Sequence, residues 1–250
     1  MITVKEIYDY INSFAPFETA MSFDNAGLLV GNPQTEVKKV LVTLDVTSKV
    51  INEAVGKNAQ LIVSHHPIIF NPIKNLLSDS VPYLAAKNNL TVISAHTNLD
   101  VARGGVNDNL AKETGVQPDR FFDEDCALIG HLSAETECKE FALYIKSKLD
   151  CNGLRFTERD GKIKNVVVSC GAGGNNIFLA KKLNADAFVT GEIKHHEIIF
   201  ANENNIAVFD LGHFKSENHI IGKLTEQLKN AFPNIGFEQS EVFDDGMQYI

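Results

Sequence analysis

Several kinds of sequence feature are missing from this chain of 250 residues, and each absence excludes a class of protein. Lysine and arginine number 23 against 32 for aspartate and glutamate, and the net charge of −9 argues against a nucleic-acid-binding surface. No apolar run approaches the length of a membrane span, and the N-terminal segment MITVKEIYDY carries charges where a signal peptide needs an apolar core. We therefore expect a cytoplasmic protein that does not bind membranes.

Cysteine is also scarce. The four cysteines form no CxxC pair and are spaced too widely for a zinc knuckle; they are Cys126, Cys138, Cys151 and Cys170. We expect reduced thiols that are mostly buried, and no disulfide framework.

The common signatures of nucleotide binding and hydrolysis are absent as well. The string CGAGGNN, residues 170–176, lacks the third glycine of GxGxxG and the GK[ST] of a P-loop. A tight turn at Gly171 to Gly174 is the expected structure, with phosphate contact through helix amides as the alternative. The string HHEIIF is not HExxH, because Phe200 stands in place of the second histidine, and no GxSxG is present.

A regular succession of strands and helices begins at Lys38. Apolar runs at 38–46, 59–64 and 90–97 predict strands, and amphipathic segments between them predict helices. This order is typical of a parallel sheet with right-handed crossovers, so the fold class is α/β.

The residues before this region predict a helix followed by a loop. Apolar positions at Ile7, Ile11 and Phe14 have helical spacing and indicate a helix over Val4–Phe14. The segment Ser22–Gly31 then predicts a loop, whose polar side chains either brace a turn or line a site.

The chain resembles itself when it is shifted by 126 residues. The shift places Lys38–Ser64 on Lys164–Thr190 without a gap, and predicted strand and helix positions coincide. We interpret this as an internal duplication with repeat units at residues 1–125 and 126–250, although any two strand–helix–strand stretches share apolar periodicity. Because no Ser/Gly-rich linker separates the halves, we expect two similar, tightly packed α/β units.

Histidines and carboxylates gather at four predicted strand ends. These groups are His65 with His66, His96 with Asp100, Glu192 with His195 and His196, and His213 with Glu217. Parallel strands present their carboxyl ends at one edge of a sheet, so we expect the groups to converge in a cleft between the two units. Where a helix begins at the histidine, the spacing of four residues places the carboxylate on the same helix face.

Imidazole and carboxylate ligands together suit first-row divalent metals such as zinc, manganese, iron, cobalt or nickel. Five to six such groups exceed the three or four protein ligands of one open zinc site. A two-metal site is therefore favoured, with a carboxylate bridging the cations and water in the remaining positions. In the alternative interpretation, some of these histidines only support the ligands or lie on the surface.

Five motifs together resemble the NIF-three-like proteins, which are commonly labelled GTP cyclohydrolase 1 type 2 homologues. The motifs cover nearly the whole length in the family's order, and they are DNAGLLVG, SHHPIIF, SAHTNLD, TGEIKHHE and DLGHFKSE. The resemblance implies a dinuclear site in which Glu217 bridges, His66 and Asp100 bind one metal, and His65 and His213 bind the other. It also implies a toroidal homohexamer, and this chain looks like the short form without an insert domain.

The resemblance further implies a metal-dependent hydrolase that converts GTP to 7,8-dihydroneopterin triphosphate and formate. An activated water would attack C8 of the purine while His96 carries protons, unless His96 only orients a ligand or caps a turn. His195 and His196 are outside the family's ligand set and line the cleft at most. Two alternatives use the same ligands: a non-catalytic metal-binding scaffold or metal-handling protein, and a two-metal phosphoesterase.

Overall fold

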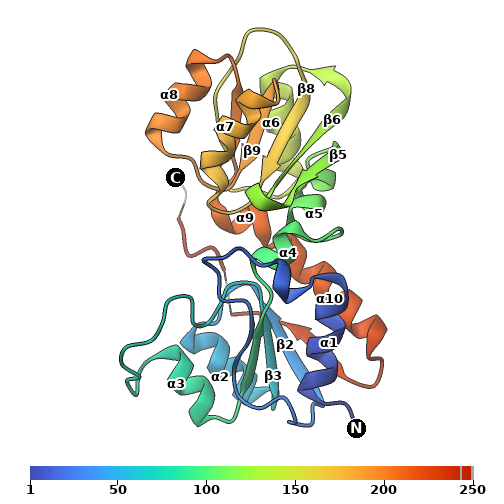
Figure 1. The fold of residues 1–250 in the computed structure, drawn as a ribbon, viewed down its shortest axis with the longest axis vertical. Helices are drawn as coiled ribbons and strands as arrows, with labels where there is room; N and C mark the ends of the chain where they lie inside the picture. The colour runs from blue at the N-terminus through green and yellow to red at the C-terminus, as the bar shows by residue number, and fades with distance from the viewer. Residues whose placement is uncertain (243, 249–250) are drawn as a thin grey trace. The chain divides into compact units, whose positions relative to one another are not determined.

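The structure is a computed structural model that describes residues 1–242 and 244–248. Contacts divide the chain into two compact units: unit 1 comprises Met1–Ala102 and Ile220–Asp244, and unit 2 comprises Arg103–His219 with residues 245–248. Each unit contains a sheet with helices on its faces (Figure 1), which confirms the predicted α/β class. The predicted internal duplication, with repeat units at residues 1–125 and 126–250, is a statement about similarity between the two halves. Division by contacts does not test it, so it stays a prediction.

Within the described residues, unit 1 has a five-stranded sheet in the order β1-β4-β3-β2-β11. The strands are β1 (Gly27–Val30), β2 (Lys39–Thr43), β3 (Leu61–Ser64), β4 (Thr91–Ser94) and β11 (Gly236–Gln239). The last four are mutually parallel, whereas β1 is antiparallel to β4. The parallel arrangement was predicted for β2, β3 and β4, but not the pairing of β2 with β11, which comes from the second predicted repeat unit. Our prediction of a loop over Ser22–Gly31 is therefore wrong for GLLV, because most of this run is only half-buried and its pairing with β4 is what defines the strand.

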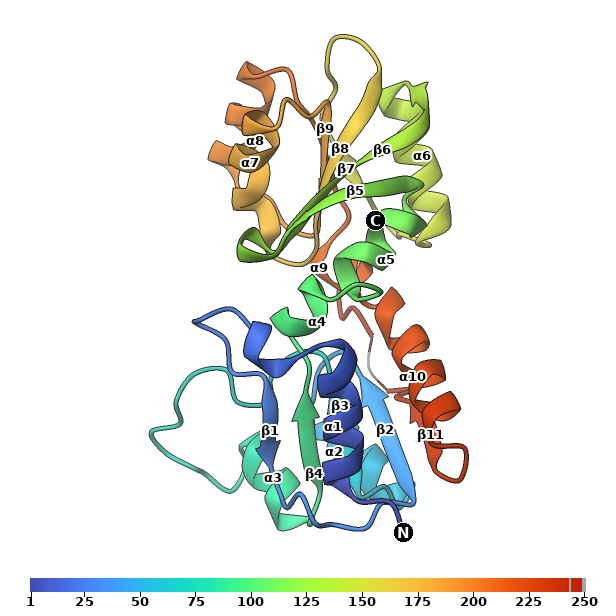
Figure 2. The ribbon, with the colours of Figure 1, turned by 45° about the vertical axis from the view of Figure 1, so that its right-hand side comes forward.

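The helices of unit 1 cover both faces of this sheet. They are α1 (Val4–Phe14), α2 (Ser48–Gly56), α3 (Val81–Lys87), α4 (Thr97–Val101) and most of α10 (His219–Ala231), with a 3₁₀ turn η1 (Phe17–Thr19). Helices α2 and α3 pack on the face formed by Leu41, Ile62 and Val92. Helices α1 and α10 lie over the other face (Figure 2), where the rings of Tyr10 and Phe232 are 5.5 Å apart.

In the described part of unit 2, the sheet has six strands in the order β5-β6-β8-β9-β10-β7. They are β5 (Val116–Phe122), β6 (Ala127–Thr136), β7 (Arg155–Phe156), β8 (Ile163–Ser169), β9 (Ala187–Thr190) and β10 (Ala207–Asp210). The parallel arrangement holds for β8, β9 and β10. The other three strands are antiparallel to their neighbours, because β5 and β6 form a hairpin through η2 (Asp123–Asp125) and β7 pairs with the edge of β10.

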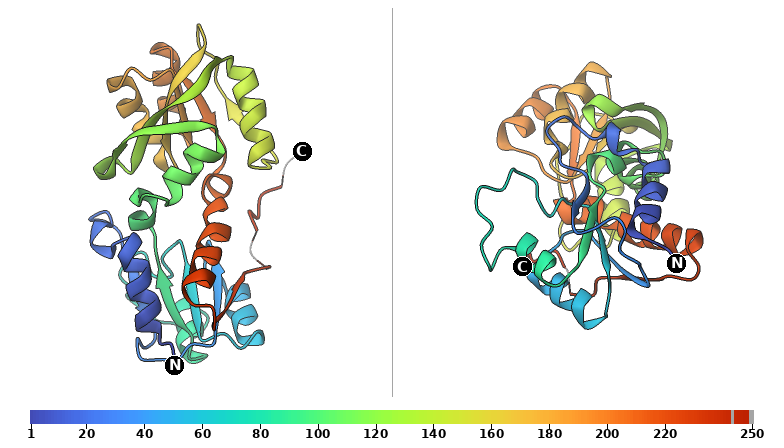
Figure 3. Two further views of the ribbon diagram at one scale, coloured as in Figure 1. Left: turned by 90° about the vertical axis from the view of Figure 1, so that its right-hand side faces the viewer. Right: turned by 60° about the horizontal axis from the view of Figure 1, so that its bottom comes forward.

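Helices also cover both faces of the second sheet. They are α5 (Val106–Glu113), α6 (Cys138–Lys148), α7 (Ile177–Lys182), α8 (His195–Glu203) and α9 (His213–Glu217), with the 3₁₀ turn η3 (Gly173–Asn176). Helices α7 and α8 pack on Val167, Phe188 and Val208. Helix α6 lies on the opposite face (Figure 3), where the rings of Phe141 and Phe209 are 4.9 Å apart.

The same order of elements recurs in both units and ends in a short helix. Unit 1 runs β2-α2-β3-α3-β4-α4, and unit 2 runs β8-α7-β9-α8-β10-α9. Helices α4 and α9 consequently start just after the carboxyl ends of β4 and β10, where the sequence places histidines and carboxylates. Elsewhere, three of the four cysteines are buried, as expected. Among the described residues, no helix has the length and apolar character to cross a membrane.

Candidate functional site

In unit 1, three histidines come together at the carboxyl ends of two neighbouring strands. His65 and His66 directly follow β3, and His96 is the N-cap of α4 after β4. One ring nitrogen from each of the three histidines lies within 4.8 Å of the others. The folded chain therefore brings together imidazoles that the sequence separates by 30 residues.

His65 is fully buried, and its ring faces oxygen acceptors on both sides. The Nδ1 atom lies 2.8 Å from the carbonyl oxygen of Ala95, which can only accept, so Nδ1 carries the proton in the neutral ring. The Nε2 atom lies 3.4 Å from Oδ1 of Asp100, whose carboxylate is also buried. A nitrogen lone pair that faces a carboxylate is favourable only with a proton or a metal cation between them, so this pair suits a metal.

The other two histidines of the group are oriented by carboxylates. Nδ1 of His66 lies 2.9 Å from Oδ1 of Asp45, and Nδ1 of His96 lies 2.8 Å from Oδ1 of Asp24. In both rings Nε2 is then the nitrogen that would bind a cation or take a proton. Histidines that bind metals usually have such a partner on the second nitrogen, because it fixes the ring and raises its basicity.

Asp24 connects His96 to the start of helix α4. Its Oδ2 atom accepts from the backbone N–H of Thr97 at 3.1 Å and from the Thr97 hydroxyl at 2.5 Å. Burial raises the pKa of Asp24, but the hydrogen bonds from His96 and Thr97 outweigh it and lower the pKa to about 2. The DNAG segment therefore braces the loop that carries His96.

We expect Asp24 to make stability depend on acidic pH. Its pKa of about 2 in the fold is below the ordinary 3.8, so the stabilisation is present above 3.8 and is lost as pH falls through 2. Urea unfolding across this range should give a smaller loss of unfolding free energy in Asp24→Asn than in the wild type. Asp119 forms a similar hydrogen bond with His131, but at an exposed position. Asp119→Asn is therefore the control, and its unfolding free energy should fall with pH as much as that of the wild type. Equal acid sensitivity in wild type and Asp24→Asn would contradict this role.

In unit 2, His213 and Glu217 are the first and last residues of α9 and lie on one face of it, as their spacing predicted. Nε2 of His213 is 3.1 Å from Oε2 of Glu217, and Nδ1 is 2.6 Å from Oε1 of Glu192. A neutral imidazole can donate to only one of these two carboxylates. A cation at Nε2 would satisfy the second one, which again suits a metal.

The glycine turn after β8 leaves space for α9. A methyl group on Gly171 would lie 2.2 Å from Oε1 of Glu217, and one on Gly173 would lie 2.2 Å from Oγ of Ser169. Ser216 fixes the turn further, because its hydroxyl accepts from the N–H of Gly171 at 2.9 Å. Close packing against protein atoms thus accounts for the glycines, and this supports the tight turn over the phosphate-binding alternative.

The donors of both units fit divalent metal ions. All four histidines have Nδ1 next to an oxygen acceptor. Asp100 lies near Nε2 of His65 and Glu217 near Nε2 of His213, and these two carboxylates are 5% and 3% exposed. Buried carboxylates are costly unless they are paired or bind a cation. His195 and His196 lack this environment, because both are exposed at the start of α8. The contact of His196 with a carboxylate is long, with Nε2 3.9 Å from Oε1 of Glu197.

Comparison with known proteins identifies the family of this chain. Residues 2–245 match the family described as Duf34/NIF3 (NGG1p interacting factor 3). The chain belongs to the Duf34/NIF3 family. The resemblance predicted from the five sequence motifs is therefore confirmed over nearly the whole length.

Similar sequences and a similar solved structure support this assignment. A Clostridium perfringens protein named GTP cyclohydrolase 1 type 2 homolog is 30% identical over 260 residues and covers 99% of each chain. A Helicobacter pylori protein named GTP cyclohydrolase 1 type 2 is 31% identical, covering 87% of this chain and 88% of that one. The crystal structure of a Staphylococcus aureus protein has a TM-score of 0.89 at 29% identity and covers 100% of this chain and 99% of that one.

The role that three carboxylates of this Duf34/NIF3 chain play in orienting histidines was not predicted from the sequence, although Glu192 was among the groups expected at strand ends. The three orient histidines from a distance along the chain, and they are Asp24, Asp45 and Glu192. Asp45 and Glu192 each follow a strand by two residues; this signal placed Glu192 among the strand-end groups, and it could have found Asp45 as well. Asp24 has no such signal, because it bonds a histidine 72 residues away.

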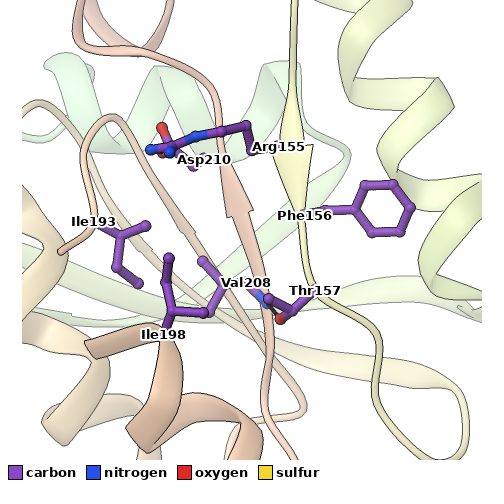
Figure 4. Close-up of a pocket in the computed structure, with 7 residues that line it drawn as sticks. All are labelled: Arg155, Phe156, Thr157, Ile193, Ile198, Val208 and Asp210. Atoms are coloured by element: carbon purple, nitrogen blue, oxygen red, sulfur yellow. Dashed lines mark hydrogen bonds and ion pairs between the residues drawn. The ribbon is translucent and has the colours of Figure 1, made fainter. Parts of the chain in front are cut away.

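A small pocket beside β7 and β10 does not add to the site of this Duf34/NIF3 protein. Its volume is about 70 Å³, well below the roughly 300–1,000 Å³ of small-molecule sites. The guanidinium of Arg155 at its rim is held by Asp210, with Nε 3.0 Å from Oδ2, so its charge is already compensated. Figure 4 shows the ring of Phe156 pointing away from Ile193 and Ile198, which line the other side of the pocket.

Proposed function

We propose that this Duf34/NIF3 protein binds two divalent cations and is a metal-dependent hydrolase that acts on GTP. The products would be 7,8-dihydroneopterin triphosphate and formate. The observation that carries the proposal is the common orientation of the four histidines, each with Nδ1 engaged by an oxygen acceptor. The name of the Helicobacter pylori relative, GTP cyclohydrolase 1 type 2, supports this choice of substrate.

Five residues would hold the cations: His65, His66, Asp100, His213 and Glu217. Unit 2 offers two of these donors, fewer than the three protein ligands of a typical open site, so we propose that they complete the set of unit 1. Three imidazoles and two carboxylates suit zinc, manganese, iron, cobalt or nickel. When bound, such cations supply Lewis acidity and activate water at neutral pH.

His96 would carry protons between water and the purine. Asp24 holds its Nδ1–H, so the lone pair of the neutral ring is on Nε2, next to His65 and His66. An Asp–His pair of this kind keeps the imidazole in one tautomer and stabilises it when it gains a proton. His96 is also close enough to His65 and His66 to be a metal ligand itself.

The decisive experiment is an assay of the purified chain with GTP and one divalent metal at a time. We expect equimolar release of formate and formation of a fluorescent pterin. Phosphate without formate would instead support a two-metal phosphoesterase. Tight metal binding with no turnover under any metal would support a metal-binding scaffold or a metal-handling protein.

The assembly and the origin of the fold are proposals that rest on the sequence. We propose a toroidal homohexamer in the cytoplasm, and an internal duplication as the source of the repeated element order. Light scattering on the purified chain should give a mass of about six times 27.5 kDa if the hexamer forms. A monomeric mass would contradict it.

A further inference from the structure

Two exposed aromatic rings lie at the rim of the histidine group in unit 1. Phe23 is 63% exposed and Phe70 is 43% exposed. Their ring centroids are 6.4 Å apart at an interplanar angle of 60°, an edge-to-face contact. Two large apolar side chains therefore contact each other while much of their surface faces solvent.

Polar anchors hold this pair in place. Next to Phe23, the carboxylate of Asp24 is bonded to His96 and Thr97. The amide of Asn25 donates from Nδ2 to the carbonyl oxygen of Ile69 at 2.6 Å, directly beside Phe70. A hydrogen bond therefore joins the two loops next to the rings, and the rings do not depend on burial to hold their positions.

The aromatic pair continues into the imidazoles. The ring of Phe70 lies 6.0 Å from that of His96 at 83°, and His96 lies 5.5 Å from His66. A planar ligand that stacks on Phe70 would therefore lie beside the ring of His96. In the proposed reaction the bond changes occur on the base, so it is the base that must lie beside the histidines.

We propose that Phe23 and Phe70 form the binding site for the purine base of a nucleotide substrate. The choice of a purine rests on the proposed function, whereas base stacking on the pair is independent of any turnover. Every base has a π-face, and stacking on an aromatic side chain contributes about 1–3 kcal/mol per base. Leu77, which is 64% exposed on the segment after Phe70, presents similar apolar area but no ring.

The experiment measures binding of GTP to the full chain with the divalent metal present, by equilibrium dialysis. Chromatography of both compartments counts intact and converted nucleotide separately. Phe23→Ala and Phe70→Ala should each weaken GTP binding by about 5- to 150-fold, as expected for the loss of one stacking contact. Phe70→Tyr should restore it, and Leu77→Ala should match the wild type. Affinity for inorganic tripolyphosphate and metal content should be equal in all variants.

Three results would overturn the inference. The first is an unchanged affinity for GTP in both alanine variants. The second is a loss of affinity for tripolyphosphate as large as the loss for GTP. The third is a lower oligomeric mass in Phe23→Ala, because the pair would then be a contact between copies of the chain. A chain that needs both rings to bind GTP but releases no formate would keep this inference and refute the proposed reaction. If the wild type converted GTP and the alanine variants bound GTP with unchanged affinity, the proposed reaction would be supported and this inference would be refuted.

Discussion

Replacing Glu217 by glutamine is expected to abolish GTP turnover and to remove at least one divalent cation per chain. The side chain is buried at the end of α9, with Oε2 3.1 Å from Nε2 of His213. Glutamine has the same size but carries no charge, so the fold should persist while the cation loses a carboxylate. Since orienting partners alone typically contribute 10- to 100-fold in metal affinity, we expect a loss of more than about 100-fold here.

Glu192→Gln is the matched control for this prediction. Glu192 is 57% exposed and contacts Nδ1 of the same histidine, so it orients the ring without facing Nε2. We expect a smaller loss of metal affinity, about 10- to 100-fold. Competition with a chromophoric chelator measures both variants, and circular dichroism checks their folding. If Glu217→Gln bound metal as the wild type does, the assignment of unit 2 donors would be wrong.

Replacing Gly171 by alanine is expected to damage both stability and metal binding. Gly171 has a φ of +55°, and its added methyl group would lie 2.2 Å from Oε1 of Glu217 and 3.3 Å from Nε2 of His213. Left-handed backbone strain costs about 1–2 kcal/mol and overpacking about 1–3 kcal/mol, so unfolding free energy should fall by about 2–5 kcal/mol. The methyl group would also displace the carboxylate of Glu217, which we propose as a metal ligand.

Gly104→Ala separates these two effects. Gly104 is in the same unit and has a φ of +80°, but no described atom lies within 4 Å of the methyl position. Urea unfolding should show a cost of about 1–2 kcal/mol from backbone strain alone, with metal content unchanged. Equal metal content in Gly171→Ala and Gly104→Ala would show that Glu217 can move without loss of the cation.

Local periodicity predicted the part of the fold that depends on local sequence. Helix α1 has the predicted bounds Val4–Phe14, and the alternation of strands and helices from Lys38 onward is as expected. Strand β1 and the two-residue β7 were missed, because their residues are mostly half-buried or exposed and only pairing with a neighbour defines them. The antiparallel hairpin of β5 and β6 likewise has no counterpart in the strand–helix pattern.

The candidate site was predicted at the level of residue types and strand ends. Histidines at strand ends are visible in the sequence, and the spacing of His213 and Glu217 correctly indicated one helix face. The partner of each Nδ1 atom could not be predicted, because Asp24 and Asp45 reach their histidines through tertiary contacts across 72 and 21 residues. The contact between Phe23 and Phe70 could not be predicted either, because their two loops meet only in the folded chain.

The pairing of β11 with β2 has a consequence for synthesis of the chain. Strand β2 belongs to the first fifth of the sequence, yet its neighbour β11 comes from residues 236–239, after all of 103–219. On the ribosome, unit 2 can therefore fold while the nascent first sheet still has an open edge at β2. The first sheet therefore gains its β11 edge only after residues 103–219 have been synthesised, so the histidines and carboxylates of unit 2 are already part of the chain before that edge is covered.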